Sequence, residues 1–213
     1  MDLAAWILLF KGAWTTIWIS GTSIAIGVTL GLLIAIIRQR SIPFVDQFLG
    51  LYISVARSTP LVTLVLFIFL ALPALGVHLD KNIAAILSLS LNTAAFNAEI
   101  WRSAIRNFSK DQREAAYACG MTEWTFFRSI MLPQVISVSL PALVNEMSFL
   151  IKGSPAVAII GLVDLTRVTN RISSVTYEPV YPILGAGLIY IVIISILVKA
   201  QSVAEVKARR LAL

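Results

Sequence analysis

The chain has 213 residues, of which 58% are hydrophobic and only 13% are charged, and its mean hydropathy is +0.87. These values exclude an ordinary soluble globular domain and indicate an integral membrane protein. The formal net charge of +6 does not indicate nucleic-acid binding, because the Lys and Arg residues lie between apolar stretches and form no single basic patch. A single cysteine, Cys119, excludes a disulfide framework or a cysteine-based zinc site, and we expect it to be a small buried residue.

The N-terminal segment is apolar but lacks the features of a secretory signal. Asp2 stands where a signal peptide would carry Lys or Arg, so we expect no cleaved signal. Because Lys11 interrupts the apolar run, residues 3–13 are predicted to form an interfacial helix, with Trp6 and Trp14 at the headgroup level. The alternative is that this segment extends the first membrane span.

Several apolar segments are long enough to cross a bilayer, which takes about 20 residues for about 30 Å of hydrocarbon. They lie near residues 15–37, 51–72, 83–105, 134–152 and 180–200. Basic residues follow the first span, separate the third from the fourth, and follow the fifth. The positive-inside rule makes this side cytoplasmic and places the N-terminus outside. The residues on this side are Arg38, Arg40, Arg106, Lys110, Arg113, Arg128, Lys199, Lys207, Arg209 and Arg210, against Lys11, Lys81, Arg167 and Arg171 on the other.

The segment between the last two spans is too short to cross. Residues 154–165 form an apolar run interrupted by Pro155 and Gly161, which predicts a re-entrant or interfacial helix beside the pathway. Residues 166–179 are rich in Thr, Ser, Asn and Arg and are expected to form an outer polar loop.

The polar stretch between the third and fourth spans has the signals of two short helices. Ser109 and Gln112 form a capping box for a helix at 110–119, and Gly120 provides its stop. Thr122 can cap a second helix at 123–132 that ends at Pro133. Such short helices cannot span a bilayer and must lie in the cytoplasm.

The second of these helices carries an apolar stripe. Trp124, Phe127 and Met131 recur at helical spacing within a charged surround, which suits docking into a groove of another protein. The alternative is an ordinary connector whose aromatic residues pack under its own membrane domain.

The same loop reads E-A-A-x3-G-x9-I-x-L-P from Glu114 to Pro133. This pattern resembles the cytoplasmic coupling loop of permease subunits of bacterial ABC importers. Residues 57–61, 92–102 and 140–146 are similar to polar amino acid uptake permeases of the histidine, glutamine and arginine type, and the likeness covers roughly residues 14–200.

Two positions depart from the pattern of that family. Ser58 stands where such permeases often have Gly, and residues 152–155 read Lys-Gly-Ser-Pro where they often read Lys-Asp-Thr-Ser. The missing acidic residue beside Lys152 weakens the transfer of a specific substrate contact, so the resemblance supports a substrate class only.

The resemblance implies an all-α integral membrane protein with the MetI-like type I ABC importer permease fold, about five transmembrane helices and a cytoplasmic coupling helix. Residues 1–213 would form one permease domain that contains the coupling loop, residues 109–133. With a second permease, identical or related, it would form an alternating-access pathway for a polar amino acid or related compound. The resemblance also implies two copies of an ABC ATPase, an extracytoplasmic substrate-binding protein, and a place in the bacterial inner membrane with the C-terminus in the cytoplasm.

Nothing in the sequence indicates an enzyme or a bound cofactor. The phosphate-binding pattern G-x4-G-K-[ST] does not occur, so ATP and Mg²⁺ are expected in the partner ATPase. The single histidine, His78, lies in an expected outer loop without a partner that would make it a base or a metal ligand. We therefore predict no catalytic and no metal-binding residues.

Two sets of residues are candidates for function. The resemblance assigns contact with the ATPase to Glu114, Ala115, Ala116, Gly120, Met121, Thr122, Trp124 and Pro133. Polar residues within apolar spans are costly and usually face a bundle interior or cavity, so the candidates for the pathway are Arg57, Thr59, Asn97, Glu99, Asn145, Glu146 and Lys152. The alternative for the second set is structural, with Glu99 paired to Arg102 and the asparagines bridging helices.

Two other classes of function remain open at this stage. An ion-coupled secondary transporter would take up substrate without ATP, but an odd number of spans without an internal repeat argues against it. A membrane scaffold or channel subunit would show no coupling of substrate to ATP turnover.

Overall fold

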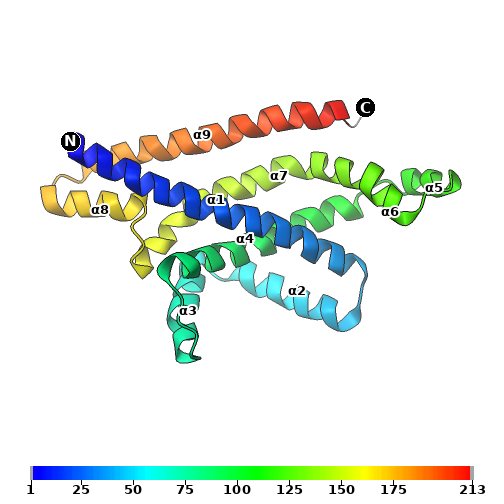
Figure 1. Ribbon diagram of the computed structural model, residues 1–213, viewed down its shortest axis with the longest axis horizontal. Helices are drawn as coiled ribbons and strands as arrows, with labels where there is room; N and C mark the ends of the chain where they lie inside the picture. Colours follow the sequence, from blue (N-terminus) through cyan, green and yellow to red (C-terminus); the bar gives the residue numbers. More distant parts are fainter. Residues whose placement is uncertain (1, 212–213) are drawn as a thin grey trace.

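The described part of the chain consists of helices joined by short connections and contains no strand. The computed structural model describes residues 2–211, with side chains described for residues 2–206, so the side chains of Lys207, Arg209 and Arg210 lie outside the described residues. Its long helices are α1 (Leu3–Gln39), α4 (Lys81–Arg106), α7 (Leu132–Gly153) and α9 (Val180–Leu211), which run along the long axis of the molecule (Figure 1). This architecture confirms the predicted all-α fold.

The second predicted span, residues 51–72, is not one straight helix. It divides into α2 (Pro43–Ser58) and α3 (Leu61–Ala74), whose axes differ by 111°, and α3 projects away from the long helices (Figure 1). The break has a local cause, because a residue before proline avoids helical torsion angles. Thr59 accordingly has φ −87° and ψ 127° before Pro60. Among the described residues, four helices can cross a membrane, and the predicted five are reached only if the bent pair counts as one span.

The predicted interfacial helix at residues 3–13 is also wrong as a separate element. These residues are the first turns of the continuous 37-residue helix α1, so the alternative of an extended first span describes the backbone. Asp2 caps α1 by accepting a hydrogen bond of 2.9 Å from the backbone N–H of Ala5. Lys11 is exposed and does not end the helix, since lysine has good helix propensity.

The contact between α1 and α4 lies at the centre of the bundle. On α1, Ser23, Gly27, Gly31 and Ala35 are buried at intervals of four residues, which places them on one face of the helix. A Cβ atom at Gly31 would lie 2.7 Å from the Cβ of Asn97 and within 3.0 Å of α4 backbone atoms. The two backbones therefore approach too closely for a side chain at this position.

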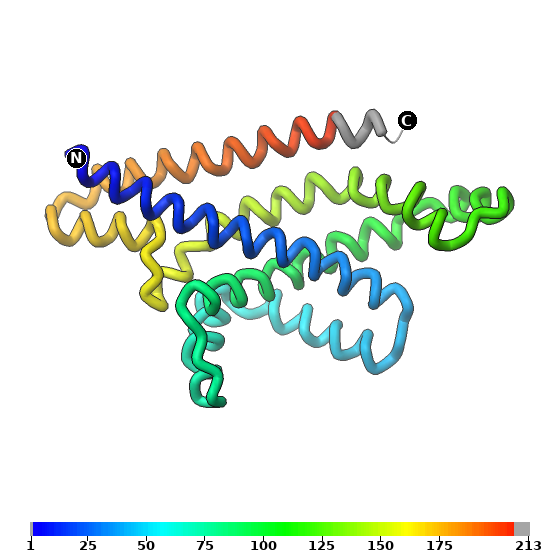
Figure 2. The backbone as a smooth tube through the Cα atoms, in the orientation of Figure 1, coloured from blue at the N-terminus to red at the C-terminus, as the bar shows by residue number. Residues whose placement is uncertain are grey.

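The segment between α7 and α9 contains two short helices. The expected short apolar element is a 3-10 helix, η2 (Ser154–Ile160), which ends at Gly161 with φ 86°. The expected loop at 166–179 is wrong for most of its length, because it contains α8 (Leu165–Thr176), which packs against the first turns of α1 and against α9 (Figure 2). Leu165, Val168 and Ile172 are buried at helical spacing on its inner face.

Asp164 caps α8 from a buried position. Its carboxylate accepts hydrogen bonds from the backbone N–H groups of Arg167 at 2.9 Å and Thr166 at 3.3 Å. Burial raises the pKa of the Asp164 carboxyl, although these two N–H groups act in the opposite direction. The capping residue thus overrides the weak helix propensity of the Thr- and Ser-rich segment that follows.

The close packing of α1 on α4 predicts opposite effects for two glycines of α1. Gly31→Ala should destabilise the protein by about 1–3 kcal/mol, because the added methyl meets backbone atoms of α4 that cannot move aside. Gly21→Ala should be neutral or stabilising by up to about 1 kcal/mol, since a Cβ there has no atom within 4 Å and alanine favours a helix. Thermal unfolding of the two purified variants measures the difference, and equal midpoints would contradict the packing argument.

Candidate functional site

The loop between α4 and α7 forms a helical projection at the end of the molecule opposite the N-terminus (Figure 1). Its first helix, α5 (Lys110–Ala118), is capped by Ser109, whose hydroxyl accepts a hydrogen bond of 3.4 Å from the N–H of Gln112. Asp111 lies in the first turn, where a negative charge suits a helix N-terminus. The helix predicted at 110–119 is thus confirmed to within one residue.

Gly120 stops α5 in the predicted manner. It has φ +77°, and the N–H groups of Gly120 and Met121 donate to the carbonyls of Tyr117 and Ala116 at 2.9 and 3.1 Å. These bonds close the end of the helix through a left-handed residue, a conformation that glycine adopts without strain. A Cβ atom at Gly120 would meet nothing within 4 Å, so only the backbone conformation restricts this position within the chain itself.

The second helix of the loop differs from its prediction. Thr122 caps α6 (Glu123–Phe126) by accepting a hydrogen bond of 3.2 Å from the N–H of Thr125. Pro133 does not end the helix, because α6 passes through a π-helical turn, η1 (Phe127–Met131), directly into α7. Pro133 lies in the first turn of α7, directly after the π-helical turn η1 has shifted the hydrogen-bond pattern. Its missing N–H is therefore tolerated.

The apolar stripe of the loop is only partly available to a partner. Trp124 is 67% exposed, Phe127 is half-buried and Met131 is buried. Phe126, which sequence reasoning missed, is only 2% exposed and lies 5.7 Å from Phe108 and 5.8 Å from Tyr117, measured between ring centroids. The alternative of aromatic residues packed under their own domain is therefore right for Phe126, whereas Trp124 remains on the surface and its docking to a partner stays a prediction.

The remaining candidates for ATPase contact differ in how far their side chains are exposed. Ala116 is buried, Met121 is half-buried, and Pro133 is exposed beyond the π-helical turn. We call the exposed residues of the two short helices and their connection the coupling surface. From these we use Glu114, Ala115, Cys119, Gly120, Thr122 and Trp124, and the name refers to these six residues. The expectation that Cys119 is buried is wrong, because the residue lies at the exposed end of α5.

An ion-pair network ties α1, α2 and α4 together near the same end of the bundle. The Arg38 guanidinium contacts Asp46 at 2.7 Å and Glu99 at 3.0 Å, and Glu99 also contacts Arg102 at 2.6 Å. The predicted pair of Glu99 and Arg102 is confirmed. Sequence reasoning treated Arg38 only as a topology signal, and no local spacing connects it to a carboxylate 61 residues away.

A cavity of about 640 Å³ lies where the junction of α2 and α3 meets α4 and α7. It brings together Thr59, Asn145 and Glu146 from the predicted pathway set. Arg57 and Lys152 lie beside it, because their charged groups stack 5.2 and 5.5 Å from the ring centroids of Phe96 and Phe149, which line the cavity. Five predicted residues thus gather at one place.

Asn97 and Glu99 do not line this cavity. The side-chain amide of Asn97 is buried and donates to the Thr93 hydroxyl within α4 at 3.2 Å, so it does not bridge two helices as expected. The bridging asparagine is Asn92, which sequence reasoning missed and which donates to the Ala56 carbonyl of α2 at 3.3 Å. Glu99 belongs to the ion-pair network.

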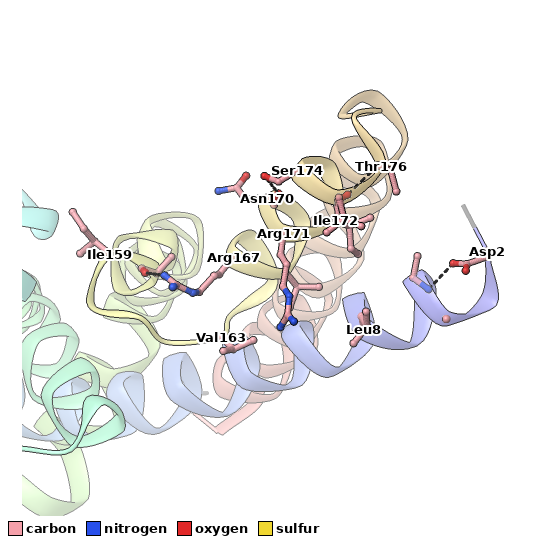
Figure 3. Close-up of a pocket in the computed structure, with 15 residues that line it drawn as sticks. Asp2, Leu8, Ile159, Val163, Arg167, Asn170, Arg171, Ile172, Ser174 and Thr176 are labelled. Carbon is pink, nitrogen blue, oxygen red and sulfur yellow. Dashed lines mark hydrogen bonds between the residues drawn. The ribbon is translucent and has the colours of Figure 1, made fainter.

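A larger groove of about 810 Å³ lies at the opposite end, between the start of α1, η2 and α8 (Figure 3). None of the predicted pathway residues lines it. Residues 2–206 contain no cluster of three or more His, Cys, Asp and Glu side chains that could hold a metal ion. His78 is exposed in the connection between α3 and α4, as predicted.

Comparison with known proteins decides the class. The family described as binding-protein-dependent transport system inner membrane component matches residues 27–209. The chain belongs to this family. It is an integral membrane permease subunit of an ABC importer, and members of the family work with an ATPase and a substrate-binding protein.

Relatives of this permease cover nearly its whole length. The arginine transport system permease protein ArtQ of Bacillus subtilis (strain 168) is 37% identical over 191 residues, covering 89% of this chain and 87% of the relative. The glutamine transport system permease protein GlnP of Escherichia coli (strain K12) is 32% identical over 192 residues, covering 89% and 88%.

Solved structures agree with the fold. A crystal structure of an amino acid ABC transporter with histidines contains a chain that is 34% identical, with a TM-score of 0.86 and coverage of 97% and 99%. The MetNI methionine ABC transporter, in an inward-facing conformation, matches at 18% identity with a TM-score of 0.82 and supports the fold alone. The MetI-like permease fold predicted from the sequence is confirmed.

The ion-pair network predicts a difference between two neighbouring arginines. Arg38→Gln leaves the carboxylates of Asp46 and Glu99 without this partner, and the Arg38 side chain is only 13% exposed. We expect a loss of about 1–3 kcal/mol in the free energy of unfolding. Arg40→Gln is the control, because Arg40 is exposed and takes part in no ion pair among residues 2–206. Thermal unfolding in detergent measures both, and an unchanged midpoint for Arg38→Gln would show that the network contributes nothing to stability.

Proposed function

We propose that this permease carries a polar amino acid or a related compound inward, together with a second permease subunit, and that the coupling surface receives the force of ATP hydrolysis. The observation that supports this most is the exposed pair of helices α5 and α6 around Gly120. The exposed side chain of Trp124 on this projection offers an apolar contact to a binding partner. The E-A-A motif lies on this projection.

The coupling surface suits a groove on the ATPase. Trp124 offers a large apolar side chain, Gly120 an open backbone position, and Glu114 a charge on the neighbouring helix. Buried Phe126 packs the projection against its own domain. A displacement of the coupling surface is therefore transmitted to that domain and does not only deform the loop. ATP and Mg²⁺ bind in the ATPase, and this chain supplies neither catalytic nor metal-binding residues.

The cavity beside α4 and α7 supports a second permease. Asn145 is exposed and Glu146 is half-buried, and hydrocarbon cannot provide hydrogen-bond partners for either. A second permease, identical or related, covers this open side and encloses the pathway. The twofold symmetry of such a pair requires two ATPase copies.

The chemistry around the cavity suits an amino acid. Glu146 offers a carboxylate to an ammonium group, and Arg57 and Lys152 offer positive charge to a carboxylate at the rim. Relatives named for arginine and glutamine transport support this substrate class. Gly153 lines the cavity where the family often has an acidic residue, so the particular amino acid does not follow.

The orientation follows from the coupling surface. The ATPase is cytoplasmic, which places α5, α6 and the C-terminus in the cytoplasm and the N-terminus outside. The substrate-binding protein then delivers its cargo at the end that carries α8. The bacterial inner membrane is the location that the family description supports. An ion-coupled transporter finds no support among the relatives or the solved structures.

Two glycines with the same backbone conformation test the coupling surface. Gly120→Asp and Gly76→Asp impose similar strain, about 1–3 kcal/mol, because the two residues have φ +77° and +82° and neither has an atom within 4 Å of an added Cβ. Gly120→Asp should lower substrate-driven ATP turnover by at least about tenfold in proteoliposomes containing the co-purified ATPase. Gly76 lies in the connection between α3 and α4, so Gly76→Asp should leave ATP turnover coupled to substrate. Wild-type coupling in assembled Gly120→Asp complexes would refute the role of this residue.

Two carboxylates test the pathway. Glu146→Gln should change the substrate range or raise KM at least about tenfold, since it removes a charge from the cavity. Glu99→Gln should lower thermal stability and leave the substrate range unchanged, because Glu99 is held by Arg38 and Arg102. Transport assays with a panel of amino acids measure both variants, and a wild-type profile for Glu146→Gln would remove Glu146 from the proposed pathway.

A further inference from the structure

The groove at the end of the molecule opposite the coupling surface has two unlike walls (Figure 3). Leu8 of α1, Ile159 of η2 and Val163 after η2 form an apolar lining on one wall, and all three are exposed. The other wall is the outer face of α8, which carries Arg167 and Arg171 on successive turns. A ligand that fills this groove needs an apolar part and an anionic part.

The two arginines are not neutralised by the protein. No ion pair among residues 2–206 involves either of them. Arg167 donates a hydrogen bond of 2.7 Å to the carbonyl of Ala158, an uncharged acceptor. Arg171 makes no side-chain hydrogen bond among the described residues, and Figure 3 shows it extending from α8 toward α1. Within the groove, the only carboxylate is Asp2, which caps α1.

The apolar wall borders the exposed side of α1, which belongs to a helix long and apolar enough to cross a membrane. Next to Leu8 along α1 lie Ile7, Phe10 and Trp14, all exposed. Trp6 and Trp14 are residues of the kind that gather at the boundary between hydrocarbon and headgroups. These side chains offer apolar surface to a hydrocarbon chain on the exposed side of α1, with Lys11 one turn from Leu8.

We propose that this groove binds an anionic phospholipid. The phosphate accepts hydrogen bonds from Arg171 and from the remaining N–H groups of Arg167, and one acyl chain lies along Leu8 and Val163. Guanidinium groups form paired hydrogen bonds with phosphate oxygens, and a headgroup with net negative charge is favoured over a zwitterionic one. A soluble protein fits less well, because the wall formed by α1 and η2 is apolar and borders the exposed apolar residues of a helix that can cross a membrane.

The test measures lipid retention by the complex purified with its ATPase and permease partners. After delipidation in detergent, native mass spectrometry compares binding of dioleoylphosphatidylglycerol with that of dioleoylphosphatidylcholine. The wild type should retain the anionic lipid about tenfold more strongly, and Arg171→Gln should lose that preference. Lys11→Gln is the control, because it removes an exposed positive charge from the same end of α1 without touching the groove, and it should bind like the wild type.

A second variant tests the apolar wall. Val163→Trp fills the groove from an exposed position and should weaken binding of the anionic lipid about tenfold while both arginines remain. Inorganic phosphate at millimolar concentration should not compete. Size-exclusion chromatography confirms that each variant assembles.

Several results would overturn the proposal. Equal binding of the two lipids by the wild type would show that the groove has no headgroup preference. An equal loss of lipid binding in Lys11→Gln and Arg171→Gln would show that the preference comes from general electrostatic attraction and not from the groove. If Arg171→Gln keeps the lipid but loses stimulation of ATP turnover by the substrate-binding protein, the groove is a docking site for that protein instead. Displacement of the lipid by phosphate would indicate a simple anion site.

Discussion

The close contact between α1 and α4 forms the centre on which the elements that carry the candidate sites pack. Inside a bilayer, apolar helices gain little from contact with one another that lipid does not already offer, so their association depends on close packing. Gly27 and Gly31 allow the backbone of α1 to approach α4, and the side chains of Thr93 and Asn97 occupy the resulting space. The other elements that carry candidate sites pack around this pair.

The polar groups of the bundle are separated along its length. The network of Arg38, Asp46, Glu99 and Arg102 lies near the coupling surface, and Thr59, Asn145 and Glu146 line a cavity farther along α4 and α7. Arg167 and Arg171 lie at the far end. The side chains of the ion-pair network bind one another. Among the described residues, the polar groups at the cavity have no such partner, so water, substrate or a second subunit must supply their hydrogen bonds.

The features that could be predicted from the sequence have local causes. The caps at Ser109 and Thr122 and the left-handed Gly120 depend on neighbouring residues, and the long apolar runs depend on composition. Local rules failed where two of them competed. Pro133 signals a helix end, but a π-helical turn accommodates it, and a segment rich in Thr and Ser forms α8 because Asp164 caps it and three apolar residues pack inward.

Contacts distant in the sequence could not be predicted at all. Arg38 meets Glu99, and Asn92 meets Ala56, only after α1, α2 and α4 have packed. The gathering of Thr59, Asn145 and Glu146 depends in the same way on the bend before Pro60, which brings the junction of α2 and α3 to α7. Composition marked these residues as costly in a membrane, but only tertiary structure separates the paired ones from those that line the cavity.

The path from the coupling surface to the cavity follows the backbone. Both helices that wall the cavity, α4 and α7, are joined directly to the loop: α4 leads into α5 through three residues, and α6 continues through η1 into α7. Because η1 keeps the chain helical where Pro133 would otherwise interrupt it, we propose that a displacement at Trp124 is transmitted into α7. In this proposal Asn145 and Glu146 move relative to Thr59 on the neighbouring junction, and the width of the cavity between them changes.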